Sequence, residues 1–275
     1  MKIARILYDG EERYGIVKEN SIELIPNPVR NSLGIESFLD SVFLMESDAT
    51  IDRSDEKIHW LPPIARPGKV ICVGRNYLAH AEEQGRSAEK KPLLFSKYPS
   101  NMVGHNSEIQ KPQTGKHLDY EVELAVVIGK EAKHVENDAM SYVFGYTVAN
   151  DLTLRDIQKT DPGKQWTRGK AFDESLPIGP VLVTKDEIED PMNLEIWLSV
   201  NGEIRQNSNT QRMIYDLEYL IRYITESITL YPGDIILTGT PEGVGYFMDP
   251  ISTLKSGDVV NCGITEVGEL KFRIR

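Results

Sequence analysis

Short apolar runs bounded by glycine, proline and asparagine recur along the chain and predict a protein built mainly from short strands. The runs that we interpret as strands lie at residues 3–8, 13–18, 21–25, 69–74, 119–129, 142–150, 180–184, 193–200, 234–238, 258–262 and 269–275. Two dipeptides of the kind that closes a tight hairpin, Asp9-Gly10 and Asn201-Gly202, predict turns between neighbouring strands.

Helical periodicity is less common. An amphipathic helix is predicted at residues 214–228, where the apolar residues at helical spacing are Leu217, Leu220, Ile221, Ile224 and Ile228. Weaker patterns predict a helix at 34–48 and polar helical segments at 77–91 and 153–161. Because the segment 77–91 has few apolar positions, we weigh a lid that moves over a site against a plain surface helix. Residues 93–119 predict irregular structure.

A proline-rich stretch, Leu61-Pro-Pro-Ile-Ala-Arg-Pro-Gly68, predicts a stiff, non-helical linker. We therefore expect a small N-terminal domain at residues 1–66 and a larger domain at residues 67–275. Strands do not alternate regularly with long helices, which argues against a doubly wound parallel sheet. The fold class predicted is α+β and rich in strands.

Composition narrows the possible partners. The net charge of −11 argues against a nucleic-acid-binding surface. The sequence contains no run of about 18 apolar residues, so no membrane-spanning helix is predicted. Charges within the first nine residues argue against a secretion signal. Cys72 and Cys262 lie in apolar sequence, which favours core packing in a reducing compartment. A cytoplasmic protein is predicted.

Two glutamates, Glu121 and Glu123, interrupt the apolar strand predicted at 119–129. Side chains two apart on a strand point to the same face, so both carboxylates converge on one patch. A divalent cation such as Mg²⁺ would relieve their repulsion, whereas a solvated face or two separate salt bridges is the alternative. A third carboxylate, Asp151, follows the strand at 142–150 and is either a helix cap or a further ligand. Together the three favour a Mg²⁺ or Mn²⁺ site more than each does alone.

A histidine and a glutamate three apart, His80 and Glu83, become neighbours if the segment 77–91 is helical. A carboxylate beside a histidine orients the ring and raises its basicity, which a general base needs. An exposed histidine with a casual neighbour is the alternative, and Glu82 is a possible substitute for Glu83. Lys170 would face an anionic substrate if a metal lay nearby, and is otherwise a surface lysine.

Residues 231–245 predict a strand followed by a glycine-rich loop that matches neither a Walker sequence nor a dinucleotide fingerprint. The loop amides and Thr240 could hold a carboxylate, or the loop could be only a tight turn. The chain contains neither a Gly-x-Ser-x-Gly elbow nor a His-Glu-x-x-His motif, so a serine hydrolase or zinc peptidase is unsupported.

Four separated motifs occur in an order that resembles the fumarylacetoacetate hydrolase family. They are Val73-Gly-Arg-Asn-Tyr77, Asp119-Tyr-Glu-Val-Glu-Leu-Ala-Val-Val-Ile-Gly129, Asn150-Asp151 and Pro232-Gly-Asp-Ile-Ile-Leu-Thr-Gly-Thr-Pro-Glu-Gly-Val-Gly245. The resemblance covers residues from about 67 to 275. It implies a mixed β-sandwich or roll, a homodimer, one Mg²⁺ or Mn²⁺ per site, and a small α-keto or diketo acid as substrate.

The resemblance also implies roles for individual residues. The metal ligands it implies are Glu121, Glu123 and Asp151. The catalytic residues it implies are the lid pair His80 and Glu83 of the acylpyruvate-hydrolase branch, with Lys170 and Gln158. The substrate-binding residues it implies are Arg155, Tyr77, Thr240 and Gly239.

The activity this implies is hydrolysis of a carbon–carbon bond in an acylpyruvate-type 1,3-diketo acid. Water activated by His80 and Glu83 would attack the distal carbonyl, and a pyruvate enolate would leave. Oxaloacetate decarboxylation, and isomerisation of the 2-hydroxyhepta-2,4-diene-1,7-dioate type, would use the same metal site and are the alternatives. A catalytically inactive protein that binds a small molecule is a more remote alternative.

Overall fold

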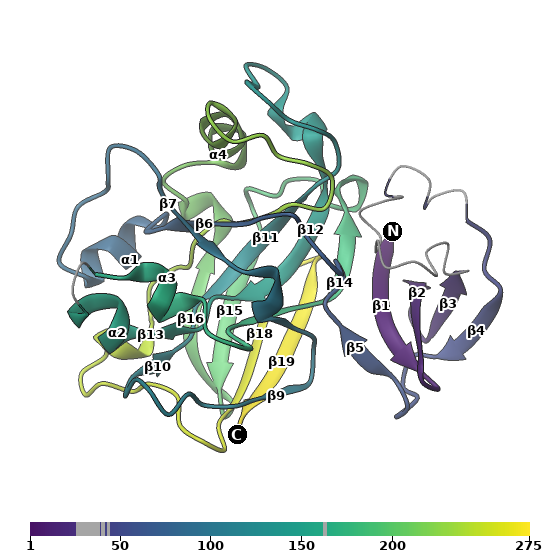
Figure 1. Cartoon of the computed structure of the whole chain (residues 1–275), viewed down its shortest axis with the longest axis horizontal. Helices are drawn as coiled ribbons and strands as arrows, with labels where there is room; N and C mark the ends of the chain where they lie inside the picture. The colour runs from purple at the N-terminus through teal and green to yellow at the C-terminus, as the bar shows by residue number, and fades with distance from the viewer. Residues whose placement is uncertain (26–38, 40–41, 43–44, 162–163) are drawn as a thin grey trace.

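The computed structural model describes residues 1–25, 39, 42, 45–161 and 164–275, drawn in colour in Figure 1. Within these residues, most strands belong to one large mixed sheet. Its order is β4 (Ala49–Asp52), β3 (Ser21–Ile25), β2 (Glu11–Val17), β1 (Lys2–Tyr8), β14 (Leu176–Thr184), β12 (Val143–Asn150), β11 (Val122–Ile128), β17 (Ile235–Leu237), β6 (Val70–Gly74) and β7 (Leu93–Lys97). Two further short strands belong to this sheet but lie off this order. β5 (His59–Leu61) pairs with β1, and β8 (Met102–Val103) pairs with β14.

A second sheet packs against the middle of the first. Its order is β16 (Glu203–Asn209), β15 (Glu195–Val200), β18 (Val259–Ile264), β19 (Gly268–Ile274) and β9 (Ser107–Ile109). Strands β15, β18 and β19 contact β11, β12 and β14, and the apolar side chains between the sheets form one continuous core. This arrangement is a β-sandwich, so the predicted strand-rich fold is confirmed.

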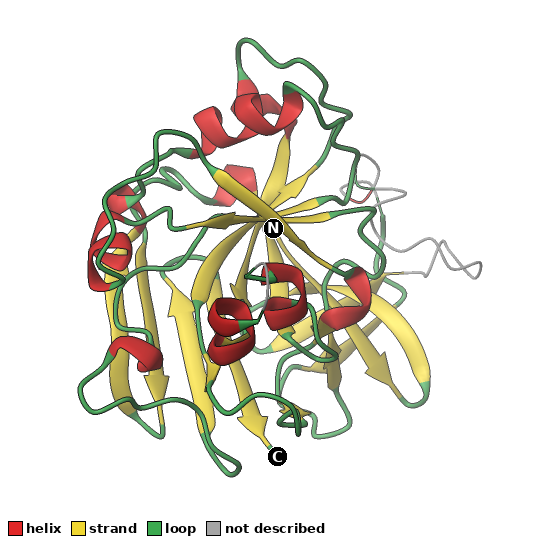
Figure 2. Ribbon diagram, turned by 60° about the vertical axis from the view of Figure 1, so that its left-hand side comes forward, coloured by secondary structure: helices red, strands yellow, loops and turns green. Residues whose placement is uncertain are grey.

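The helices are short and lie outside the strands, as Figure 2 shows. Among the described residues the α-helices are α1 (Leu78–Glu83), α2 (Arg155–Thr160), α3 (Trp166–Lys170) and α4 (Leu217–Thr225), and the other helical turns are short 3-10 helices. A small two-stranded ladder, β10 (Leu118–Asp119) with β13 (Thr153–Leu154), lies just before α2. Figure 1 places α1, α2 and α3 together on the side of the molecule away from β1–β4.

The N-terminal strands extend the large sheet, because β1 pairs antiparallel with β14. Asp9 and Gly10 close the predicted hairpin between β1 and β2, both with positive φ. The same geometry closes the predicted hairpin at Asn201 and Gly202. The division of the chain into domains at residue 66 stays a prediction.

Three predictions of local structure need comment. The predicted helix at 77–91 was too long, because α1 ends at Glu83 and Gly85 turns the backbone at a φ of +68°. Residues 93–119, predicted to be irregular, hold the short strands β7 to β10. β7 pairs with the preceding strand β6, whereas β8, β9 and β10 pair with strands that come later in the chain. The helix predicted at 34–48 falls mostly outside the described residues.

Candidate active site

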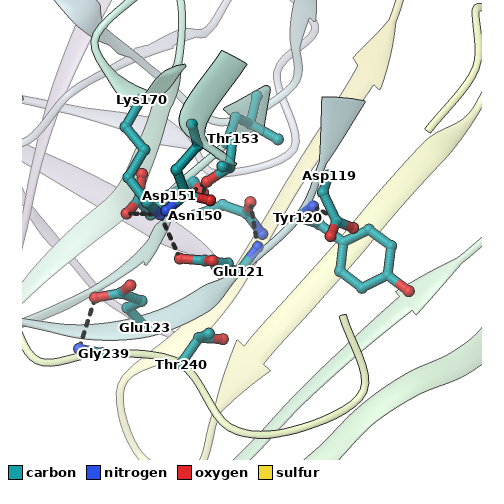
Figure 3. Close-up of polar contacts among 12 residues, drawn as sticks. Asp119, Tyr120, Glu121, Glu123, Asn150, Asp151, Thr153, Lys170, Gly239 and Thr240 are labelled. Atoms are coloured by element: carbon teal, nitrogen blue, oxygen red, sulfur yellow. Dashed lines mark hydrogen bonds and ion pairs between the residues drawn. The ribbon is translucent and has the colours of Figure 1, made fainter. Parts of the chain in front are cut away.

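The three predicted carboxylates meet where β11 and β12 run antiparallel. Glu123 lies on β11, Glu121 lies just before it, and Asp151 follows the last residue of β12. The N–H of Asp151 donates to the carbonyl of Glu121 at 2.8 Å, which brings the two side chains alongside each other. One oxygen from each carboxylate lies within 4.8 Å of the others, and all three side chains are buried (Figure 3).

Two buried lysines lie among these carboxylates. Nζ of Lys170, at the end of α3, donates to Oε2 of Glu121 at 2.8 Å and to Oδ2 of Asp151 at 2.7 Å. It also donates to the hydroxyl of Thr153 at 2.8 Å. Nζ of Lys97, at the end of β7, lies 2.9 Å from Oδ1 of Asp151. Lys170 is therefore a buried cation at the site rather than a surface lysine.

The surroundings shift the pKa values of the two glutamates in opposite directions. Burial alone would raise the pKa of Glu121, but the positive charges of Lys170 and Arg155 lower it to about 2. Burial, and then the negative charges of Asp151 and Glu121, raise the pKa of Glu123 well above its ordinary value. Glu121 is therefore ionised, whereas Glu123 holds a proton unless a further cation lies beside it.

A guanidinium group adjoins the carboxylates, and one of its nitrogens makes no hydrogen bond among the described residues. Nε of Arg155 donates to Oδ2 of Asp119 at 2.8 Å, and Nη1 lies 2.6 Å from Oε1 of Glu121. Oδ1 of Asp119 is itself held by the N–H of Gly245 at 2.8 Å. Nη2 of Arg155 is buried and has no hydrogen-bond partner among the described residues, so it can donate to a ligand. Gln158 lies one turn along α2, with Oε1 3.4 Å from Nη1 of Arg155.

The predicted histidine pair is present and is completed by a glutamine. Nδ1 of His80 lies 2.5 Å from Oε1 of Glu83, and Nε2 lies 2.8 Å from Nε2 of Gln84. Both contacts fit one neutral tautomer, with Nδ1–H donating to Glu83 and Nε2 accepting from Gln84. The other oxygen of Glu83 accepts the N–H of Gly243 at 3.0 Å, so the glycine-rich loop fixes the pair.

One small cavity joins these groups. Its volume is about 10 Å³, which is about the room that one water molecule or one monatomic ion needs. The predicted site residues that line it are His80, Glu121, Glu123, Arg155, Gln158, Lys170 and Thr240. An organic acid is larger than this cavity, so side chains in its wall must shift before a substrate can enter.

Two of the predicted substrate-binding residues do not line the cavity. The N–H of Gly239 donates instead to Oε2 of Glu123 at 2.7 Å, so it holds a carboxylate of the cluster in place. Tyr77 is buried, and its hydroxyl has no hydrogen-bond partner among the described residues. The hydroxyl of Thr240 accepts from Nε2 of Gln206 at 2.9 Å.

The cluster fits a divalent cation. Counted over the described residues, it holds four buried carboxylates and three buried cations, namely Asp119, Glu121, Glu123 and Asp151 with Lys97, Arg155 and Lys170. Oδ1 of Asp151 accepts no well-aligned hydrogen bond, although Lys97 lies close to it. A Mg²⁺ or Mn²⁺ ion would favour the ionised form of Glu123, which then leaves the carboxylates in excess over the cations, and would bind the carboxylate oxygen that lacks a hydrogen bond.

The comparison with protein families agrees with this geometry. A family model described as fumarylacetoacetate (FAA) hydrolase C-terminal matches residues 69–275. The chain belongs to the fumarylacetoacetate hydrolase family. The match contains every residue of the site described above, so the resemblance seen in the four sequence motifs is confirmed.

One protein similar to this chain is named for the tautomerisation of oxaloacetate and not for hydrolysis. The human protein named oxaloacetate tautomerase FAHD2A, mitochondrial, is 50% identical over 213 residues, which are 77% of this chain and 68% of that protein. The structure of a fumarylacetoacetate hydrolase from Exiguobacterium antarcticum is 35% identical with a TM-score of 0.87, and covers 100% of this chain and 99% of its own.

A fumarylacetoacetate hydrolase family structure with a metal is also similar. Fumarylpyruvate hydrolase from Pseudomonas aeruginosa, in complex with Mn²⁺ and pyruvate, is 34% identical with a TM-score of 0.70. The match covers 81% of this chain and 93% of that one. None of the helices in the described part of the chain is long and apolar enough to cross a membrane.

The sequence analysis missed three residues that position the site. Asp119 was quoted only within a motif, yet it orients Arg155; Lys97 was not singled out, yet it lies beside Asp151. Gln84 was not considered, yet it caps the ring nitrogen of His80. The one available signal was a charged residue at the end of an apolar run, which applies to Asp119 and Lys97 and is too common to be decisive.

Proposed function

We propose that this chain is a divalent-metal-dependent enzyme that transfers a proton at the carbon next to the keto group of a small 2-oxo acid. The reaction we assign first is keto–enol interconversion of oxaloacetate. The observation that carries this proposal is that His80, held by Glu83, lines the same small cavity as Glu121, Glu123 and Lys170. The 50% identity to a protein named an oxaloacetate tautomerase supports it.

Glu121, Glu123 and Asp151 would hold the metal. Bound there, Mg²⁺ or Mn²⁺ supplies a Lewis acid that polarises the keto group of the substrate. Nη2 of Arg155 has a free N–H with which to bind the substrate carboxylate. The pKa of Lys170 is raised, because the charges of Asp151 and Glu121 outweigh its burial, so its ammonium group stabilises the negative charge of an enolate.

His80 acts as the base. Its Nε2 carries the lone pair in the tautomer that Glu83 and Gln84 fix, so it can accept a proton from the carbon beside the keto group. The electron pair of that carbon–hydrogen bond enters the new carbon–carbon double bond. The ring then returns the proton to the enolate oxygen, and no bond of the carbon chain breaks. Lid movement that withdraws Gln84 would free Nε2 for this role.

Hydrolysis of acylpyruvates is the second candidate, and it needs the same groups. His80 would take its proton from water, the hydroxide would attack the distal carbonyl, and a pyruvate enolate would leave. The similarity to a fumarylpyruvate hydrolase favours it. Oxaloacetate decarboxylation and double-bond isomerisation also pass through an enolate, so they remain activities to be assayed. A binding protein without catalysis would not need the oriented His80.

Enol absorbance of oxaloacetate and of acetylpyruvate should be followed in parallel, with Mg²⁺ and then with excess EDTA. We expect EDTA-sensitive acceleration of oxaloacetate tautomerisation, lost in His80→Ala and kept in His134→Ala, which changes an exposed histidine. Turnover of acetylpyruvate alone would instead support the hydrolase. Failure to accelerate either reaction, with the metal bound, would refute both candidates.

The cytoplasmic location and the homodimer stay predictions. The protein named FAHD2A is described as mitochondrial, which concerns that protein.

A further inference from the structure

A second cavity, of about 220 Å³, lies directly beside the metal-binding one. The two share Arg75, Gln84, Gln158 and Trp166 in their walls. The remaining residues that line the second cavity are Arg86, Lys159 and Lys164. We call this space the cationic cavity. It adjoins the place where the keto acid would bind, and the lid residue Gln84 belongs to both.

The wall of the cationic cavity holds four cations and no carboxylate. Arg75 is paired with Glu89 and lies over the ring of Trp166. Arg86, Lys159 and Lys164 make no ion pair among the described residues, in a chain whose net charge is −11. Arg86 and Lys164 are exposed and Lys159 is half-buried, and such a concentration of positive charge at a surface cavity attracts anions.

Lys159 lies within this group of positive charges. Its Nζ lies 3.9 Å from the centre of the ring of Phe247, so an aromatic face and not a carboxylate lies against it. Burial, and then the positive charges of Arg155 and Arg86, lower the pKa of Lys159 to about 8. An anion in the cavity would stabilise the charged lysine and bring its pKa back up.

We propose that the cationic cavity binds a second carboxylate of the substrate, at the end away from the keto acid. This assignment rests on the proposed function, because it requires the 2-oxo acid end to lie at the carboxylate cluster. The site then selects 2-oxo dicarboxylates over monocarboxylic 2-oxo acids, by charge and not by the shape of an apolar pocket. Arg86 and Lys159 are the residues that carry this selectivity, since neither has a carboxylate partner within the chain.

Equilibrium binding separates this selectivity from catalysis. Calorimetric titrations of the Mg²⁺-loaded protein would compare 2-oxoglutarate with 2-oxopentanoate, which has a methyl group in place of the distal carboxylate. Longer pairs of the same kind would cover the distance to the cavity. Arg86→Gln and Lys159→Gln each remove one charge from the wall. Lys91→Gln removes one charge from an exposed lysine that lines neither cavity and is the matched control.

We expect the wild type to bind the dicarboxylate at least tenfold more tightly at one or more lengths. Arg86→Gln and Lys159→Gln should each reduce that ratio severalfold while leaving the affinity for the monocarboxylate within twofold, and Lys91→Gln should change neither. Equal binding of both members of every pair would overturn this inference and leave the proposed function intact. Binding of neither ligand type at any length would contradict the proposed function itself, and the inference with it.

Discussion

Nδ1 of His80 and Oε1 of Glu83 lie 2.5 Å apart, and the carboxylate that makes this contact is not that of the adjacent Glu82. The sequence left Glu82 as a possible substitute for Glu83, although helical geometry favours the residue three positions away. Glu82 is exposed, whereas Glu83 is also held by the N–H of Gly243 in a distant loop. The orientation of the proposed base is therefore set by a contact across the fold.

Replacing Glu83 by glutamine should lower kcat. A glutamine can accept at the same place but carries no charge, so the imidazolium formed during proton transfer loses its stabilisation. We expect kcat to fall about 100-fold, the lower end of what a general base contributes, with KM changed little. Glu82→Gln removes the same charge from the same helix and should stay near wild-type activity. Equal losses in the two variants would argue against the dyad.

Binding of Mg²⁺ should stabilise the folded protein. A ligand that binds only the folded state adds about 2.7 kcal/mol at a concentration 100 times its Kd. We therefore expect the melting temperature to rise with Mg²⁺ and to fall again with EDTA. Asp151→Asn should abolish this response.

The control for the metal is Glu131→Gln, which removes one negative charge from an exposed residue outside the cluster. It should respond to Mg²⁺ as the wild type does. A melting temperature indifferent to both metal and chelator would rule out the carboxylate cluster as a metal site.

Gly243 should tolerate no side chain. Its φ is +98°, and a Cβ placed there would lie 2.1 Å from the carbonyl oxygen of Arg205. We expect Gly243→Ala to lower the free energy of unfolding by about 2 kcal/mol or more, measured by denaturant titration. It should also lower activity, because the N–H of Gly243 holds Glu83.

Gly202→Ala is the control for backbone strain alone. Gly202 has a φ of +84°, but no atom lies within 4 Å of a Cβ placed there. We expect it to cost about 1 kcal/mol. If the two alanine variants were equally stable, the close approach to Arg205 would not be rigid.

Affinity for dicarboxylates should depend on the ionisation of Lys159. Burial lowers the pKa of Lys159 most, the charges of Arg155, Arg86 and Arg75 lower it further, and Asp119 raises it, which gives a pKa of about 8. A lysine is charged below its pKa. Affinity for 2-oxoglutarate should therefore weaken as the pH rises from about 7 to about 9, whereas affinity for 2-oxopentanoate should not.

Lys159→Gln supplies the test of that assignment. The variant should bind 2-oxoglutarate more weakly at neutral pH and show no further weakening between the two pH values. A pH profile that the substitution leaves unchanged would assign the titration to another group.

Local backbone geometry explains what the sequence determined. Side chains alternate along extended backbone, so Glu121, just before β11, and Glu123, on β11, are expected on the same face, and Asn201-Gly202 is expected to turn the chain between two pairing strands. The amphipathic helix α4 follows from its spacing in the same way. These features depend on neighbours a few residues apart, and the motifs built on them were enough to recognise the family.

Only the tertiary structure decided which groups complete the site. Lys97 reaches Asp151 from a strand that the sequence left irregular, and Asp119 holds Arg155 across 36 residues. The cationic cavity brings together Arg75 after β6, Arg86 after α1, Lys159 in α2 and Lys164 before α3, which lie in separate segments of the sequence. These contacts depend on how distant segments pack together in the fold, and the periodicity of the sequence does not indicate that packing.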